Sequence, residues 1–280
     1  MSLRLVCLGD SFTEGMCDDL RSDGHHMGWA DRVAVGLAAS ESLRGQAVQY
    51  ANLAVRGKLL DQVIEEQVSS GCAMDPTILT FHAGANDVLR RGTDLPALFR
   101  RYETAVAAVA DSADRVVLFT AVGRAGGTGR LATLLAERFG RFNANVRETA
   151  YRHGAIVVDL ESATVLTDRR LWNEDRLHLT SAGHRRVAAA VLEALNVTDP
   201  TLLGGEVGWW RVPLPPAAQP GRVEATRTDL RWIRRHLLPW VGRRLRGVSS
   251  GDGRQPKDPV LRTVPVEGDG HAIRRGPTAG

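Results

Sequence analysis

Five short apolar runs, each closed by turn-forming residues, indicate buried β-strands, because they are too short for helices. They cover residues 3–8, 48–53, 77–81, 115–120 and 155–160. Between these runs, apolar residues recur every three or four positions, which is typical of helices that bury one face. Asp94 and Thr180 precede two of these periods and are residue types that cap helix N-termini. Strand and helix therefore alternate to about residue 196.

This alternation predicts an α/β fold, because right-handed crossovers place the strands in one parallel sheet with helices on both faces. We expect a three-layer α/β/α sandwich with a five-stranded sheet in the flavodoxin-like order 2-1-3-4-5. Ligands of such open sheets bind at the carboxyl ends of the strands. Chemistry should therefore lie in the loops that follow strands 1, 2 and 3.

The pattern changes after residue 197, so we expect three parts: a domain over 1–197, an appendage over 198–246 and a disordered tail over 247–280. The appendage is rich in Pro, Trp and Arg and contains one predicted amphipathic helix. The tail is rich in Gly, Ser and Pro and poor in aliphatic residues. We expect the apolar stripe of the helix, which begins at Leu230, to pack on the core or on a second subunit. Contact of residues 222–246 with a membrane surface or a partner protein is the less favoured alternative.

Composition narrows the function classes. The 36 basic and 32 acidic residues leave a net charge of +4, so no nucleic-acid partner is expected. The excess lies in residues 198–280, with 14 basic and 8 acidic side chains. Three cysteines without a CxxC pair predict neither a disulfide framework nor a zinc site. With no signal-peptide pattern and no apolar run of about 18 residues, we expect a cytoplasmic protein.

Candidate chemistry follows the predicted strands. Ser11 stands in the loop after the first strand, Gly57 in the loop after the second, and Asn86 in the loop after the third. Asp175 and His178 lie three residues apart before the last core helix, a spacing that lets a carboxylate orient an imidazole. Each piece alone is ordinary turn chemistry. Together they supply a nucleophile, an oriented base and donors for an oxyanion, which are the parts needed for acyl transfer.

These four blocks resemble the SGNH hydrolases, also called the GDSL esterase/lipase family, over residues 3–196, about 70% of the chain. One departure is Phe12, which stands where the family name has Leu. The resemblance implies the SGNH hydrolase fold and a catalytic triad of Ser11, His178 and Asp175. It also implies an oxyanion hole formed by the N–H groups of Ser11 and Gly57 and the amide of Asn86, with no metal or organic cofactor.

The implied activity is hydrolysis of a carboxylic ester through an acyl-enzyme. A short acyl or acetyl ester of a small molecule or sugar is favoured. Lysophospholipase, thioesterase or acyltransferase activity on the same site is the alternative. From another class, a flavodoxin-like phosphate or cofactor binder would use the Ser11 loop, and an inactive interaction module would use the appendage. Both leave Asn86 and the Asp175/His178 pair without a role.

One further group, His25 and His26 with the nearby Asp18, Asp19 and Asp23, has the residue types of a metal site. Nothing in the spacing fixes the geometry of the ligands. A solvated loop near the substrate entrance is therefore favoured, and no metal is predicted.

Overall fold

The structure is a computed structural model that describes residues 2–122, 129–217, 221–239, 242 and 249–266 of the 280-residue chain. Its strands are β1 (Leu3–Gly9), β2 (Val48–Asn52), β3 (Ile78–His82), β4 (Arg115–Phe119), β5 (Ile156–Val158) and β6 (Asp258–Thr263). Its α-helices are α1 (Ser11–Glu14), α2 (Gly28–Ser42), α3 (Leu60–Val63), α4 (Ser69–Cys72), α5 (Ala85–Val88), α6 (Leu95–Ala110), α7 (Arg130–His153), α8 (Ser181–Ala194), α9 (Pro200–Leu203) and α10 (Arg222–Trp232). Shorter 3-10 or π-helical segments are η1 (Ile64–Val68), η2 (Thr164–Thr167), η3 (Arg169–Leu171), η4 (Trp209–Arg211) and η5 (Ile233–Leu237).

The sheet has the order β5-β4-β3-β1-β2-β6. Strands β1 to β5 are all parallel and follow the predicted flavodoxin-like order, so the predicted fold class is confirmed. The loops after β1, β2 and β3 therefore meet at one edge of the sheet, since these three strands are neighbours.

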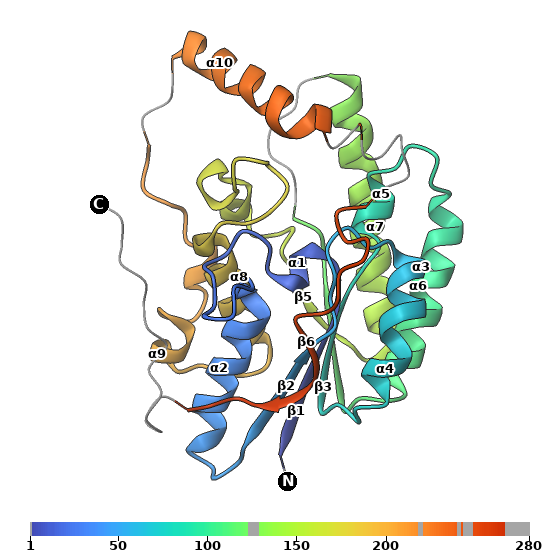
Figure 1. Cartoon of the computed structure of the whole chain (residues 1–280), viewed down its shortest axis with the longest axis vertical. Helices are drawn as coiled ribbons and strands as arrows, with labels where there is room; N and C mark the ends of the chain where they lie inside the picture. The colour runs from blue at the N-terminus through green and yellow to red at the C-terminus, as the bar shows by residue number, and fades with distance from the viewer. Residues whose placement is uncertain (1, 123–128, 218–220, 240–241, 243–248, 267–280) are drawn as a thin grey trace.

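The two faces of the sheet bury separate hydrophobic clusters. Along β1, Leu5 and Cys7 face one cluster with α2 and α8, while Val6 and Leu8 face the other with α6 and α7. This alternation is the period of two expected for a strand covered on both faces. Figure 1 shows α2 and α8 on one side of the sheet and α3, α4, α6 and α7 on the other.

The predicted helix starts are confirmed at Asp94 and Thr180. Asp94 caps α6 by accepting a hydrogen bond from the backbone N–H of Ala97, and Thr180 caps α8 in the same way through Gly183. Within the described ranges, no helix combines the length and the apolar character that a bilayer crossing requires.

The first part of the appendage packs on α8. Arg186 of α8 donates hydrogen bonds to the carbonyls of Trp209, Trp210 and Val212, and Glu193 accepts one from the Trp210 indole. The predicted helix forms as α10 and η5, which lie across the carboxyl edge of the sheet above α1 and α8 (Figure 1). Leu230, at which its apolar stripe begins, is 56% exposed in this single chain, so it does not pack on the core, and packing on a second subunit stays a prediction.

Part of the segment expected to be a disordered tail is ordered. Residues 258–263 form β6, which pairs antiparallel with β2 at the edge of the sheet. Two buried ion pairs hold this segment: Lys257 with Asp31 at 2.5 Å, and Asp258 with Arg21 at 2.6 Å. Polar anchors and backbone pairing order this stretch, so a shortage of aliphatic residues was a poor guide here. Residues 247, 248 and 267–280 lie outside the described part of the chain.

Candidate active site

A cavity of about 330 Å³ lies at the carboxyl edge of the sheet. Its wall includes all five residues singled out from the sequence: Ser11, Gly57, Asn86, Asp175 and His178. The rest of the wall is largely apolar, formed by residues such as Phe12, Leu89, Phe139, Leu160 and Trp172. Five positions spread over 168 residues of sequence thus border one space.

Ser11 is the first residue of α1, directly after β1. The turn is fixed from both sides. Asp10 caps the helix by accepting from the backbone N–H of Phe12 at 3.0 Å. Gln67 of η1 holds Gly9 through two hydrogen bonds, one to its N–H and one to its carbonyl. The Ser11 hydroxyl therefore borders the cavity from a rigid support, and no hydrogen bond to it is found among the described residues.

Gly57 follows β2 and has φ +76°, in the left-handed region that favours glycine. A Cβ at this position would lie 2.3 Å from the Ser249 hydroxyl oxygen, so a larger residue has no room. The preceding residue, Arg56, forms an ion pair with Glu14 of α1, and its backbone N–H donates to the same carboxylate at 2.6 Å. The Gly57 loop is thereby tied to the helix that carries Ser11.

Asn86 belongs to α5, directly after β3. Its amide nitrogen donates to the Asp10 carboxylate at 3.1 Å and to the Lys58 carbonyl at 3.0 Å. These bonds join the loops after all three central strands, and Asn86 lines the cavity. The backbone N–H groups of Ser11 and Gly57 have no acceptor among the residues described here, so both remain available as donors.

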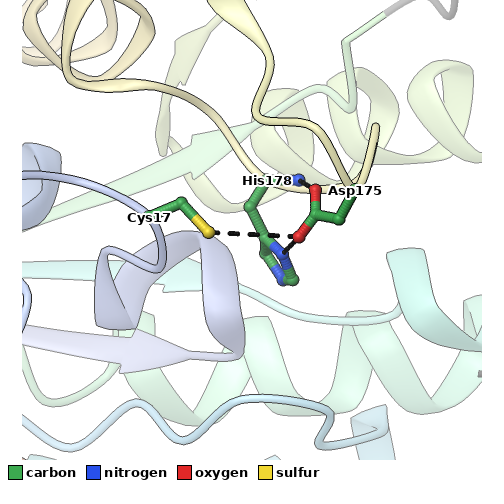
Figure 2. A group of neighbouring side chains, drawn as sticks. All are labelled: Cys17, Asp175 and His178. Carbon is green, nitrogen blue, oxygen red and sulfur yellow. Dashed lines mark hydrogen bonds and ion pairs between the residues drawn. The ribbon is translucent and has the colours of Figure 1, made fainter. Parts of the chain in front are cut away.

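Asp175 and His178 form a hydrogen-bonded pair on the loop before α8. The His178 Nδ1 atom lies 2.6 Å from Asp175 Oδ2 (Figure 2). The other carboxylate oxygen, Oδ1, accepts from the backbone N–H groups of Leu177 and His178 at 2.8 and 3.0 Å. The two backbone donors hold the carboxylate through Oδ1, and Oδ2 in turn holds the imidazole ring through Nδ1.

The interaction between Asp175 and His178 shifts the pKa of each residue. Burial acts to lower the pKa of His178, but the hydrogen bonds and charges of Asp175 and Cys17 outweigh it and raise the pKa to about 9. Burial acts to raise the pKa of Asp175, but the contact with His178 and two backbone donors lowers it to about 2. Near neutral pH the free site therefore holds an imidazolium–carboxylate pair.

Cys17 is a neighbour that sequence reasoning missed. Its thiol lies 3.9 Å from Asp175 Oδ2, the carboxylate oxygen that also contacts His178 Nδ1 (Figure 2). Cys17 has φ +69°, which is unusual for a residue with a side chain. In the described ranges, Cys17, Asp175 and His178 are the one set of three metal-ligand types whose atoms lie within 4.8 Å of one another.

His82, at the end of β3, was also missed. It is buried, lines the cavity and lies 3.5 Å from Asp10 through Nδ1. Its ring centroid is 4.4 Å from that of Phe12. The position directly after a predicted strand was a signal that the sequence offered, because it shares the sheet edge with Asn86.

The loop with His25 and His26 does not gather ligands. Asp18 is buried and pairs with Arg32, and Asp23 pairs with Arg21. Arginine is thus the partner of these two carboxylates. None of the five residues weighed as metal ligands lines the cavity, so the expectation that they border the substrate entrance is not met.

Four further residues of the cavity wall come from the C-terminal third: Arg235, His236, Pro239 and Ser250. The Ser249 hydroxyl donates to the Gly57 carbonyl at 3.3 Å. Segments that the sequence assigned to an appendage and a tail therefore border the same space as Ser11.

Comparisons with known proteins agree with this geometry. The model of the GDSL-like Lipase/Acylhydrolase family matches residues 7–186. A search of curated protein sequences gives no significant match. Among solved structures, a catalytic mutant of an acetylxylan esterase from Geobacillus stearothermophilus is similar, with TM-score 0.58, 19% identity, and coverage of 70% of this chain and 96% of that one.

Two other solved structures are similar in fold. A putative GDSL-like lipase from Parabacteroides merdae has TM-score 0.56 and 20% identity, covering 70% of this chain and 96% of its own. A lipase/acylhydrolase from Enterococcus faecalis has TM-score 0.54 and 20% identity, covering 69% of this chain and 95% of its own. In each of these matches about 30% of this chain lies outside the coverage.

Proposed function

The chain belongs to the GDSL-like lipase/acylhydrolase family and is a carboxylic ester hydrolase, and from this premise we propose that Ser11, His178 and Asp175 act as its catalytic triad. The observation that carries the proposal is the oriented Asp175–His178 pair, which borders the same cavity as Ser11. The mechanism needs a hydrogen bond from the Ser11 hydroxyl to His178. The hydroxyl can rotate toward the imidazole, and catalytic hydrogen bonds of this kind tighten when substrate binds.

In the proposed mechanism, the Ser11 hydroxyl attacks the ester carbonyl while the neutral imidazole of His178 takes its proton. Asp175 keeps the remaining proton of the ring on Nδ1 and stabilises the imidazolium that forms. The imidazolium then protonates the departing alcohol. Water attacks the acyl-enzyme by the same proton transfers and releases the acid, which regenerates Ser11.

In this proposal three donors hold the oxyanion: the backbone N–H groups of Ser11 and Gly57 and the amide of Asn86, all from residues that line the cavity. The two backbone groups have no other acceptor in the described part of the chain. The amide of Asn86 already donates to Asp10 and Lys58, so a bound oxyanion would take the place of one of these acceptors. Such preorganised donors stabilise charge in the transition state without reorganisation.

The cavity favours a short acyl group. A volume of about 330 Å³ is at the small end of ligand pockets and must hold both the acyl and the alcohol parts. An acetyl ester of a sugar or another small polar alcohol fits this limit. The similarity in fold to an acetylxylan esterase supports this choice.

The test is hydrolysis of p-nitrophenyl esters from acetate to palmitate by the wild type and by Ser11→Ala. We expect the highest kcat/KM with acetate or butyrate, and a loss of at least about 1000-fold in Ser11→Ala. A fluorophosphonate probe should label the wild type at Ser11 and leave the variant unlabelled. Thr13→Ala, two residues away, is the control for the variant's fold. Activity or labelling that survives in Ser11→Ala would refute the assignment.

A further inference from the structure

The cavity has a roof that comes from outside the matched family region. The match ends at residue 186, whereas η5 and the helical residues directly after it contribute Arg235, His236 and Pro239 to the cavity wall. Family membership therefore explains the reacting groups but says nothing about this roof.

The roof is docked on the loop that carries the proposed base. The Trp232 indole N–H donates to the Asp175 carbonyl at 2.9 Å. Arg176, between Asp175 and His178, forms an ion pair with Asp229 of α10. Its guanidinium carbon also lies 4.6 Å from the centroid of the Trp232 ring, a cation–π contact. Three contacts thus fix the position of Arg235 relative to the catalytic loop.

The same segment carries a cluster of arginines for which no partner is found among the residues that the structure describes. A second hollow on α10 and η5 is lined by Arg227, Leu230, Arg231, Arg234 and Arg235. Arg235 borders both this hollow and the catalytic cavity, so the two spaces adjoin there. Among the described residues, none of these four guanidinium groups has a hydrogen bond or an ion pair, while Asp229 is already paired with Arg176.

Other arginines at this edge of the sheet have structural partners. Arg56 pairs with Glu14, and Arg169 donates to two carbonyls of its own loop. Arg235 differs, because no partner of its guanidinium is found in the described part of the chain and the residue lines a largely apolar cavity. A planar guanidinium in this setting is a binding group for phosphate or carboxylate, which it can hold through two parallel hydrogen bonds.

We propose that the substrate is an ester whose alcohol part carries a phosphate group, and that Arg235 binds this phosphate. The inference rests on the proposed function, because it takes Ser11 as the group that attacks the ester carbonyl. The apolar wall suits the acyl part, so the charge belongs on the alcohol. Four adjoining arginines favour a phosphate, with its greater charge and several acceptor oxygens, over a single carboxylate.

The experiment compares two esters that differ only in the phosphate: 1-acetylglycerol 3-phosphate and 1-acetylglycerol. We expect the wild type to show a kcat/KM at least about tenfold higher for the phosphorylated ester, and this preference to shrink as salt is raised. Arg235→Gln should remove most of the preference, so that the ratio of the two kcat/KM values falls toward one. Arg100→Gln, an exposed arginine on α6, is the matched control and should keep the preference.

A third ester, 1-palmitoylglycerol 3-phosphate with its neutral analogue, identifies the source of the phosphate. A preference with the acetyl pair supports a soluble phosphorylated metabolite, and a preference confined to the palmitoyl pair supports a lipid headgroup. The proposal is overturned if neither pair shows a preference, or if Arg235→Gln slows both members of a pair equally. Failure of the proposed function has a different signature, namely equal activity of the wild type and Ser11→Ala on every ester.

Discussion

Replacement of Asp175 by Asn tests how the catalytic loop sets the state of its imidazole. In the wild type, Oδ1 accepts from two backbone N–H groups and Oδ2 accepts from His178 Nδ1. In Asp175→Asn, the amide oxygen should stay with the two backbone donors, because the amide nitrogen cannot accept from them. The NH₂ group then faces Nδ1, which must become an acceptor. The ring proton moves to Nε2, and the ring can no longer take a proton from Ser11.

Two effects follow, with opposite signs at neutral pH. The pKa of His178 is about 9 in the wild type and should fall in the variant, because the largest interaction that opposes the effect of burial is lost and only that of Cys17 remains. The variant therefore has more neutral imidazole at pH 7, where the wild type has about 1%. That neutral ring is the wrong tautomer, and kcat should fall about 10⁴-fold.

The assay is kcat/KM for p-nitrophenyl acetate between pH 5.5 and 10. Because the base must be neutral, wild-type activity should rise with pH, reach half of its maximum near pH 9 and level off only above that pH. The variant should be slow throughout, and its residual activity should level off at a lower pH. Glu174→Gln removes the same charge from the exposed neighbouring residue and should keep the wild-type profile. The reasoning fails if Asp175→Asn keeps more than a tenth of the activity at pH 9, or if the wild type levels off at pH 6.5.

Three further substitutions probe the donors and the C-terminal anchor. Asn86→Ala should lower kcat for an acetyl ester roughly 100- to 1000-fold with a smaller effect on KM, since one oxyanion donor contributes about 3–4 kcal/mol; a loss below tenfold in steady-state kinetics would contradict this role. Gly57→Ala should lower the free energy of unfolding by at least about 1–2 kcal/mol because of φ +76° and the contact with Ser249, and adding Ser249→Gly should restore part of it in urea unfolding. Lys257→Met should lower the free energy of unfolding by up to about 3–5 kcal/mol, because it removes one of the two cations, Lys257 and Arg21, that pair with the buried carboxylate of Asp31. A melting temperature equal to that of the wild type would show that the β6 segment is not held by this ion pair.

The central sheet could be predicted because its signal is local. Each of the first five strands is a short apolar run closed by turn residues, and the alternation with helices allows few topologies. The carboxyl ends of β1, β2 and β3 then had to share one edge, which brought Ser11, Gly57 and Asn86 to one cavity. These strands and helices form because they bury apolar side chains, and the spacing of apolar residues along the sequence shows which side chains are buried.

Contacts between polar groups far apart in sequence could not be predicted in this way. Cys17 contacts Asp175, which is 158 positions away in the sequence. Cys17 also has a positive φ of 69°, which the residues around it do not predict. Only two of the 36 basic residues are lysines, and one of them, Lys257, is buried. Its ammonium donates to the Asp31 carboxylate and to three backbone carbonyls, a compact set of acceptors that a planar guanidinium would not fit. A buried ammonium site of this kind cannot be predicted from the pattern of hydrophobic and polar residues.

These same contacts determine how the C-terminal third acts on catalysis. Lys257 donates to the carbonyl of Glu14, whose carboxylate holds Arg56, and Ser249 bonds the carbonyl of Gly57. Residues 249–257 therefore brace the helix that carries Ser11 and the loop that carries a proposed oxyanion donor. Substitutions there should slow every ester to a similar degree, because they move donors common to all substrates. Arg235 has no protein partner to lose among the described residues, so its replacement should act through the substrate alone. A similar loss of activity on every ester would therefore indicate that a residue supports the structure of the site, whereas a loss confined to phosphorylated esters would indicate that it binds the substrate.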